Sequence, residues 1–117
     1  MLSLALPGKV FLCLTPADMR KSFDGLSELV RTGLGGDPLS GHLFVFRNRR
    51  GDRLKFLYWD CDGLAVWAKR LERGTFQFPS TADTAASVEV TSTELALVLG
   101  GIDLQSARRR PRYRRPA

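Results

Sequence analysis

The chain has 117 residues, a hydrophobic fraction of 44% and a formal net charge of +6. That length is typical of one domain, and the apolar fraction is sufficient for a hydrophobic core. No run approaches the roughly 20 apolar residues that span a bilayer, so we expect no membrane helix. The apolar stretch at the N-terminus has no basic residues before it, so we expect no secretory signal. We therefore expect a cytoplasmic protein, with Cys13 and Cys61 as reduced thiols.

The positive charge is concentrated at the C-terminus. Residues 106–117 form an arginine-rich tail, and without its arginines the basic and acidic residues of the chain balance. Mutual repulsion, together with Pro111 and Pro116, predicts that the tail is disordered when unbound. Each guanidinium can bind a phosphate through two hydrogen bonds, so the tail is predicted to bind nucleic acid, or alternatively to dock on a protein. The six arginines concerned are Arg108, Arg109, Arg110, Arg112, Arg114 and Arg115.

The first elements of the remaining domain, residues 1–105, are a strand and a helix. Residues 10–14 form a short apolar run that predicts a buried strand. A helix should follow, with Thr15, Asp18 or Ser22 as its N-cap, and should end in the glycines at 33–36. Its predicted buried stripe, at helical spacing, is Phe23, Leu26, Leu29, Val30 and Leu34.

A β-hairpin is predicted next. Residues 42–47 and 53–59 are rich in aromatic and branched side chains, and the loop 48–52 between them contains Gly51. Both faces of the first strand are apolar, with Leu43 and Val45 on one side and Phe44 and Phe46 on the other. We therefore expect a central strand that is covered on both sides.

The C-terminal half is predicted from weaker signals. Residues 64–71 match helical spacing, with Asp62 as N-cap and Gly74 beyond the end, although strand alternation also fits in part. Residues 75–78 suggest a brief edge strand and 88–91 a final one. Thr91 and Glu94 then form a capping box that opens a last helix. The order β-α-β-β-α-β-β-α predicts an α+β domain with a mostly antiparallel sheet and about three helices.

The acidic residues offer little support for catalysis. Asp18, Asp24, Asp60 and Asp62 are conceivable metal ligands of a nuclease. Helix caps, the helix dipole and turns nevertheless explain each of them structurally. There is one histidine, His42, and no phosphate-binding glycine loop. We therefore expect no catalytic residues, metal site or cofactor, and not an enzyme.

The hairpin loop is the better candidate for a functional site. Four arginines surround Asn48 and Gly51, and a basic β-ribbon can enter a DNA groove or straddle a phosphate backbone. An ordinary solvated loop is the alternative. Lys69, Arg70 and Arg73 would extend the basic patch if their predicted helix packed beside the hairpin. The loop arginines are Arg47, Arg49, Arg50 and Arg53.

Several blocks of the sequence resemble the TnpB proteins, the second-open-reading-frame products of the insertion-sequence-sixty-six family. These blocks are residues 18–26, 37–55, 58–60 and 64–74, followed by 94–103, so the resemblance covers nearly the whole domain. Cys61 and Ala68 depart from the pattern, where a glycine or small polar residue and an aromatic residue are commoner. The motif residues are Asp18, Met19, Arg20, Lys21, Asp24, Gly25, Tyr58, Trp59, Asp60, Trp67, Lys69 and Arg70.

The resemblance implies an accessory role in transposition, beside a transposase encoded by the same element. It supplies no catalytic residues. Together with the basic segments, it leads us to expect a protein that assists transposition by binding the transposase, the DNA of the element ends, or both. A pure protein–protein adaptor and a divalent-metal nuclease are the alternatives.

Overall fold

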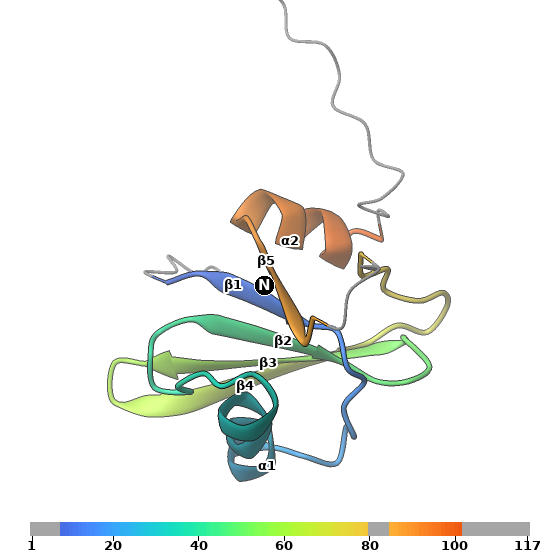
Figure 1. Ribbon diagram of the computed structural model, residues 1–117. Helices are drawn as coiled ribbons and strands as arrows, with labels where there is room; N and C mark the ends of the chain where they lie inside the picture. Colours follow the sequence, from blue (N-terminus) through green and yellow to red (C-terminus); the bar gives the residue numbers. More distant parts are fainter. Residues whose placement is uncertain (1–7, 80–84, 102–117) are drawn as a thin grey trace, which may run out of the picture.

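A computed structural model describes residues 8–79 and 85–101 of the chain. A five-stranded sheet lies between two helices, α1 on one face and α2 on the other (Figure 1). No helix within these two ranges is long and apolar enough to cross a membrane. The elements in chain order are β1 (Val10–Cys13), α1 (Phe23–Glu28), the π-helical turn η1 (Leu29–Gly33), β2 (Leu43–Arg47), β3 (Arg53–Asp60), β4 (Gly63–Arg70), β5 (Ser87–Val90) and α2 (Ser92–Leu99).

The sheet has the strand order β4-β3-β2-β1-β5. β1 and β2 are parallel, joined by the crossover through α1, and the other three neighbouring pairs are antiparallel. The predicted α+β class and mostly antiparallel sheet are therefore confirmed. The predicted count of three helices and the predicted order are not confirmed, because the described residues give the order β-α-β-β-β-β-α, with η1 continuing α1.

Alternation along the strands divides the core into two clusters. Leu43 and Val45 of β2 lie in the cluster beneath α2, whereas Phe44 and Phe46 lie in the cluster beneath α1. All four side chains are buried. The prediction of a central strand covered on both faces is confirmed, and the β2–β3 hairpin forms with the predicted loop at 48–52.

The first helix begins at the latest of the three predicted positions. Ser22 is its N-cap, without a side-chain hydrogen bond, and Asp24 lies in the first turn. Leu26 and Val30 are fully buried as predicted, but Phe23 is 47% exposed because it lies at the first position of the helix, away from the sheet. Asp18 is not a helix cap, since it lies in the preceding loop and accepts hydrogen bonds from Arg20.

The predicted helix at 64–71 is wrong, because these residues form strand β4. A tight turn at Cys61 and Asp62 returns the chain along β3, with Asp60 opposite Gly63 and Phe56 opposite Trp67. The Phe56 and Trp67 rings lie 4.5 Å apart between centroids, so Trp67 contributes to the sheet core instead of to a helix stripe. Asp62 is a turn residue and not an N-cap.

The predicted edge strand at 75–78 does not form either. The segment crosses the α2 face of the sheet and buries Phe76 and Phe78 there. The Phe76 amide donates to the carbonyl of Gly51 at 2.7 Å. This segment therefore packs against the face of the sheet. The spacing of Phe76 and Phe78, two residues apart, is compatible with this packing as well as with a strand.

The capping box of the last helix is confirmed. The Thr91 hydroxyl accepts from the Glu94 amide at 3.1 Å, and the Glu94 carboxylate accepts from the Thr91 amide at 3.0 Å. Leu95 and Val98 are buried, and the helix ends at Leu99 with Gly100 as its C-cap. The cap thus fixes where α2 begins after β5.

Replacing Thr91 with alanine should lower the free energy of unfolding by about 1 kcal/mol, because the Glu94 amide loses its acceptor. Chemical denaturation measures this directly. Thr93→Ala is the control, since Thr93 is exposed on the same helix and takes no part in the cap. Equal stability of the two variants would contradict the assigned role of Thr91.

Replacing Cys61 with glycine should raise the free energy of unfolding by up to about 1 kcal/mol. Cys61 has φ = 54°, which is a left-handed conformation that costs a residue with a Cβ atom roughly that much. Cys61→Ala retains the Cβ and serves as the control. If the glycine variant is no more stable than the alanine variant, backbone strain at this turn is not the cause.

Candidate nucleic-acid interface

The tip of the β2–β3 hairpin is organised by one asparagine side chain. Asn48 Oδ1 accepts from the amides of Gly51 and Arg53 at 2.9 and 3.0 Å, and its Nδ2 donates to Asp52 at 2.7 Å. The loop is therefore held by internal hydrogen bonds. Arg49 and Arg50 are left exposed at the tip.

Arg47 has a different environment from the other loop arginines. It is half-buried, its Nη1 donates to the carbonyl of Phe76 at 3.1 Å, and its guanidinium carbon lies 4.4 Å from the centroid of the Phe78 ring. Burial lowers the pKa of Arg47 from its ordinary value. These contacts hold the 76–78 segment on the sheet, so the structure places Arg47 in the packing of the domain.

Pairing of β3 with β4 brings distant cations together. Arg53 lies directly opposite Arg70, and Leu54 opposite Lys69. Arg53, Lys55, Lys69 and Arg70 line one hollow of about 130 Å³ with Met19. Alternation along β4 puts the Lys69 side chain on the other face of the sheet from that of Arg70. Like charges opposite each other destabilise a sheet, and a bound anion would relieve the repulsion. These cations, together with those of the hairpin tip and of the loop before α1, are called the basic rim. The basic rim consists of Arg20, Lys21, Arg49, Arg50, Arg53, Lys55, Lys69 and Arg70.

The loop before α1 reaches the same rim. Lys55 Nζ donates to the carbonyl of Lys21 at 2.7 Å, which ties this loop to β3. Gly25 permits the approach, because a Cβ at that position would lie 3.0 Å from the Lys21 side chain. Lys55 therefore ties the 18–21 loop to the sheet, and Gly25 leaves room for the Lys21 side chain beside α1.

The acidic groups beside the rim are each bound locally. Arg20 donates to the Asp18 carboxylate at 2.7 Å, and this hydrogen bonding lowers the pKa of Asp18 to about 2. Glu72 pairs with Arg70 at 3.0 Å. Asn48 is the main cause of the lowered pKa of Asp52. Within the part of the chain that the structure describes, Arg49, Arg50, Arg53 and Lys69 take part in no salt bridge.

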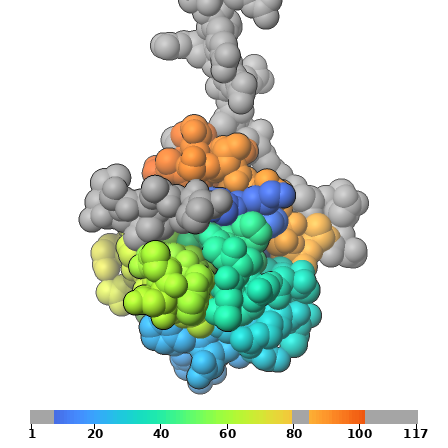
Figure 2. Space-filling view, turned by 90° about the vertical axis from the view of Figure 1, so that its left-hand side faces the viewer, coloured from blue at the N-terminus to red at the C-terminus, as the bar shows by residue number. Residues whose placement is uncertain are grey.

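The opposite end of β3 and β4 carries acidic residues. Asp60 and Asp62 lie at the β3–β4 turn. The segment around this turn is the yellow-green region that faces the viewer in Figure 2. Lys55, beside the 18–21 loop, is five residues from Asp60, or roughly 16 Å along the strand. The carboxylates considered for a nuclease are thus split between the two ends, and no three potential metal ligands gather among the described residues.

The aromatic motif residues belong to the sheet. Tyr58 and Trp67 pack against the cluster beneath α2, and Trp59 lies opposite Leu64 in the neighbouring strand. All three are half-buried. For Tyr58 and Trp67, the place in the family motif therefore has a packing explanation.

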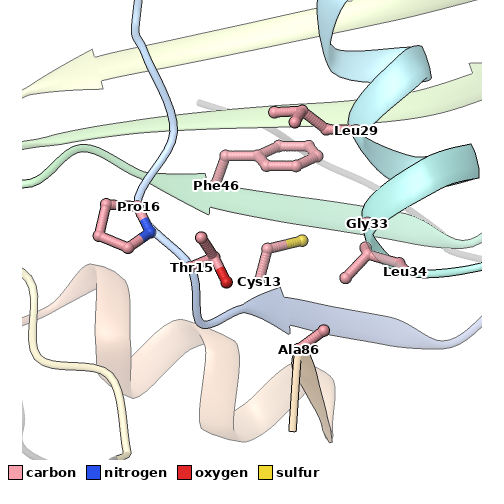
Figure 3. A pocket seen from close by; sticks show the side chains of 8 residues that line it. All are labelled: Cys13, Thr15, Pro16, Leu29, Gly33, Leu34, Phe46 and Ala86. Carbon is pink, nitrogen blue, oxygen red and sulfur yellow. The ribbon is translucent and has the colours of Figure 1, made fainter. Parts of the chain in front are cut away.

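A small apolar hollow of about 100 Å³ lies between the end of β1 and η1 (Figure 3). Cys13, Phe46 and Leu29 line it together with Pro16 and Leu34. Burial raises the pKa of the Cys13 thiol to about 12, so the thiol remains protonated and is a poor nucleophile. This hollow is a packing feature and offers no acid–base chemistry.

The sequence anticipated part of the rim. It predicted Arg49, Arg50 and Arg53 at the hairpin, and it predicted that Lys69 and Arg70 would join them only through a helix. Lys55 was missed, although its alternation with Arg53 on one strand face is a usable signal. Arg73 is exposed beyond β4. The tail arginines predicted to bind nucleic acid lie outside the described residues.

Comparison with known proteins gives a consistent family assignment. Two proteins of Sinorhizobium fredii are similar, both named as uncharacterized. Protein y4jC is 37% identical over 103 residues, covering 88% of this chain and 86% of its own length. Protein y4hO is 38% identical over 95 residues, covering 81% of each chain. No solved structure matches.

The model of the family described as IS66 Orf2 like protein matches residues 8–109. This range contains both core clusters and the whole basic rim. The chain therefore belongs to the IS66 Orf2-like family of insertion-sequence proteins.

Proposed function

We propose that this protein assists transposition by binding DNA through the basic rim, beside the transposase of the same element. The observation that carries the proposal is the convergence of motif residues from two distant parts of the sequence. Met19 of the loop before α1 and Lys69 and Arg70 of β4 line the same hollow. Packing alone does not require exposed cations at both places.

The rim has the chemistry for a phosphate backbone. Its arginine and lysine side chains come from the hairpin tip, from adjacent strands and from the 18–21 loop, so they are spread over a surface that extends beyond the small hollow. Such a spread suits several phosphates in a row better than one small anion. The three acidic residues beside the rim already have partners. Asp18 forms a salt bridge with Arg20, Glu72 forms one with Arg70, and Asp52 accepts a hydrogen bond from Asn48.

The tail at 106–117 is proposed to contribute further phosphate contacts. Its arginines follow the folded domain and would strengthen binding without specifying a DNA sequence. The element ends are the DNA that the family role suggests. In this proposal the transposase supplies the chemistry, and the present chain supplies affinity and placement.

Removing two exposed rim charges in Arg50→Gln/Arg53→Gln should weaken binding to a DNA duplex from the element end. The slope of log K against log salt concentration should become less steep by about 0.9 for each phosphate that the variant no longer neutralises. Arg31→Gln/Lys9→Gln removes the same charge elsewhere on the domain and should alter the slope little. An unchanged slope for the rim variant would exclude the rim from the interface.

Deleting residues 106–117 tests the tail separately. The truncated protein should bind the same duplex more weakly, again with a flatter salt dependence. An unchanged slope would remove the tail from the mechanism. Co-purification of the full-length protein with the transposase, without measurable binding of this protein to DNA, would instead favour the adaptor function.

A further inference from the structure

We propose that two copies of this chain associate through the outer edge of β4, joining their sheets into one continuous antiparallel sheet. β4 is the edge strand of the sheet, and its eight residues, Gly63–Arg70, make it twice as long as the other edge strand, β5. Long edge strands expose unpaired backbone groups that favour pairing with another chain.

The hydrogen-bonding pattern of β4 with β3 identifies which backbone groups of β4 can pair with another strand. The Leu71 amide donates to the Asp52 carbonyl at 2.8 Å, continuing the register in which Asp60 lies opposite Gly63. Because the pattern alternates along an antiparallel pair, the odd-numbered residues of β4 bond to β3. The even-numbered residues therefore direct their backbone N–H and C=O groups outward. No strand among residues 8–79 and 85–101 pairs with them.

The two sides of β4 differ, which limits the possible registers. Val66 packs in the cluster beneath α1 and Trp67 in the cluster beneath α2. A two-fold axis normal to the sheet keeps the same face of both copies on the same side. Even-numbered residues must then lie opposite even-numbered residues of the second copy.

Charge selects one of these registers. With Val66 opposite Val66 of the second copy, Asp62 lies opposite Arg70 of that copy, and this pairing occurs twice. Leu64 then lies opposite Ala68, and Ala65 opposite Trp67, which places small side chains beside large ones. A shift of two residues, centred on Trp67, would instead place Leu64 opposite Arg70. The acidic turn before β4 and the basic end of β4 thus complement a second copy of the same chain, with Arg70 exchanging its exposed partner Glu72 for Asp62 of that copy.

This surface meets the basic rim at Arg70, but its partner is a second copy of the chain and not DNA. Four of the eight rim cations come from the hairpin tip and the 18–21 loop, and only Lys69 and Arg70 belong to β4. The dimer would present two copies of the rim, related by the two-fold axis. Self-association without DNA therefore tests this inference independently of the proposed function.

A charge swap is the sharpest test, read out by sedimentation equilibrium of the full-length protein across the micromolar range. Wild type should approach twice 13.0 kDa. Asp62→Arg and Arg70→Asp should each raise the dissociation constant at least about tenfold, and the double variant should restore it. Within one chain these residues are eight positions apart, roughly 26 Å, so restoration can arise only between copies. Glu89→Arg, on the other edge strand, is the matched control and should leave the dissociation constant unchanged.

A monomeric wild type throughout that range would overturn the proposal, as would failure of the double variant to recover. If a charge variant does not fold, backbone substitutions give a second test. Ala68→Pro removes one outward amide and should abolish the dimer, whereas Ala68→Ser retains the amide and should not. Hydrogen exchange of the backbone amides of the wild type gives a third test. The amides of Leu64, Val66 and Ala68 should exchange more slowly as the protein concentration rises. Equal exchange rates at all protein concentrations would refute the interface.

Discussion

Antiparallel pairing of β3 with β4 is the constraint on which the rest of this structure depends. It extends the sheet beyond the β2–β3 hairpin and places the Trp67 ring against Phe56 in the core. It also sets Arg53 beside Arg70, although they lie far apart in the sequence. One backbone register therefore creates the core contact, the basic rim and the free edge of the sheet.

The pairing of β3 with β4 also explains why the β2–β3 hairpin could be predicted from the sequence and β4 could not. The β2–β3 hairpin was predictable because both strands are rich in branched and aromatic residues and a glycine-containing loop joins them. β4 was not, because Leu64, Trp67 and Leu71 also fit helical spacing. The turn that decides the matter contains Cys61 in a left-handed conformation, where a glycine would have been a clear signal. Tertiary pairing with β3 outweighed the local pattern.

Only part of the candidate site could be predicted from the sequence, because some of its residues are brought together only by the fold. Charge clusters that are contiguous in sequence, such as Arg49 and Arg50, can be found by inspection. Lys55 and the 18–21 loop join them only through register and a hydrogen bond between Lys55 and the Lys21 carbonyl. The environment of Arg47 could not be predicted, because sequence cannot show that the 76–78 segment folds back over it. Motif residues thus divide into those that build the sheet and those that shape the rim.

The division of charge along the sheet connects these features to a role in transposition. Basic groups gather where the hairpin tip meets the end of β4, and Asp60 and Asp62 occupy the opposite end. A polar arrangement of this kind would orient the domain on a phosphate backbone by electrostatic attraction alone. Catalysis is left to the transposase under this proposal, and the family member contributes binding and orientation.

Nuclear magnetic resonance titration with an element-end duplex shows directly whether the basic rim binds DNA. Binding at the rim predicts that the amide signals of residues 49–55 and 69–70 shift together with those of the 18–21 loop, while signals of the β3–β4 turn remain in place. Shifts confined to the β3–β4 turn and α2, or no shift at any DNA concentration at low salt, would contradict binding at the rim.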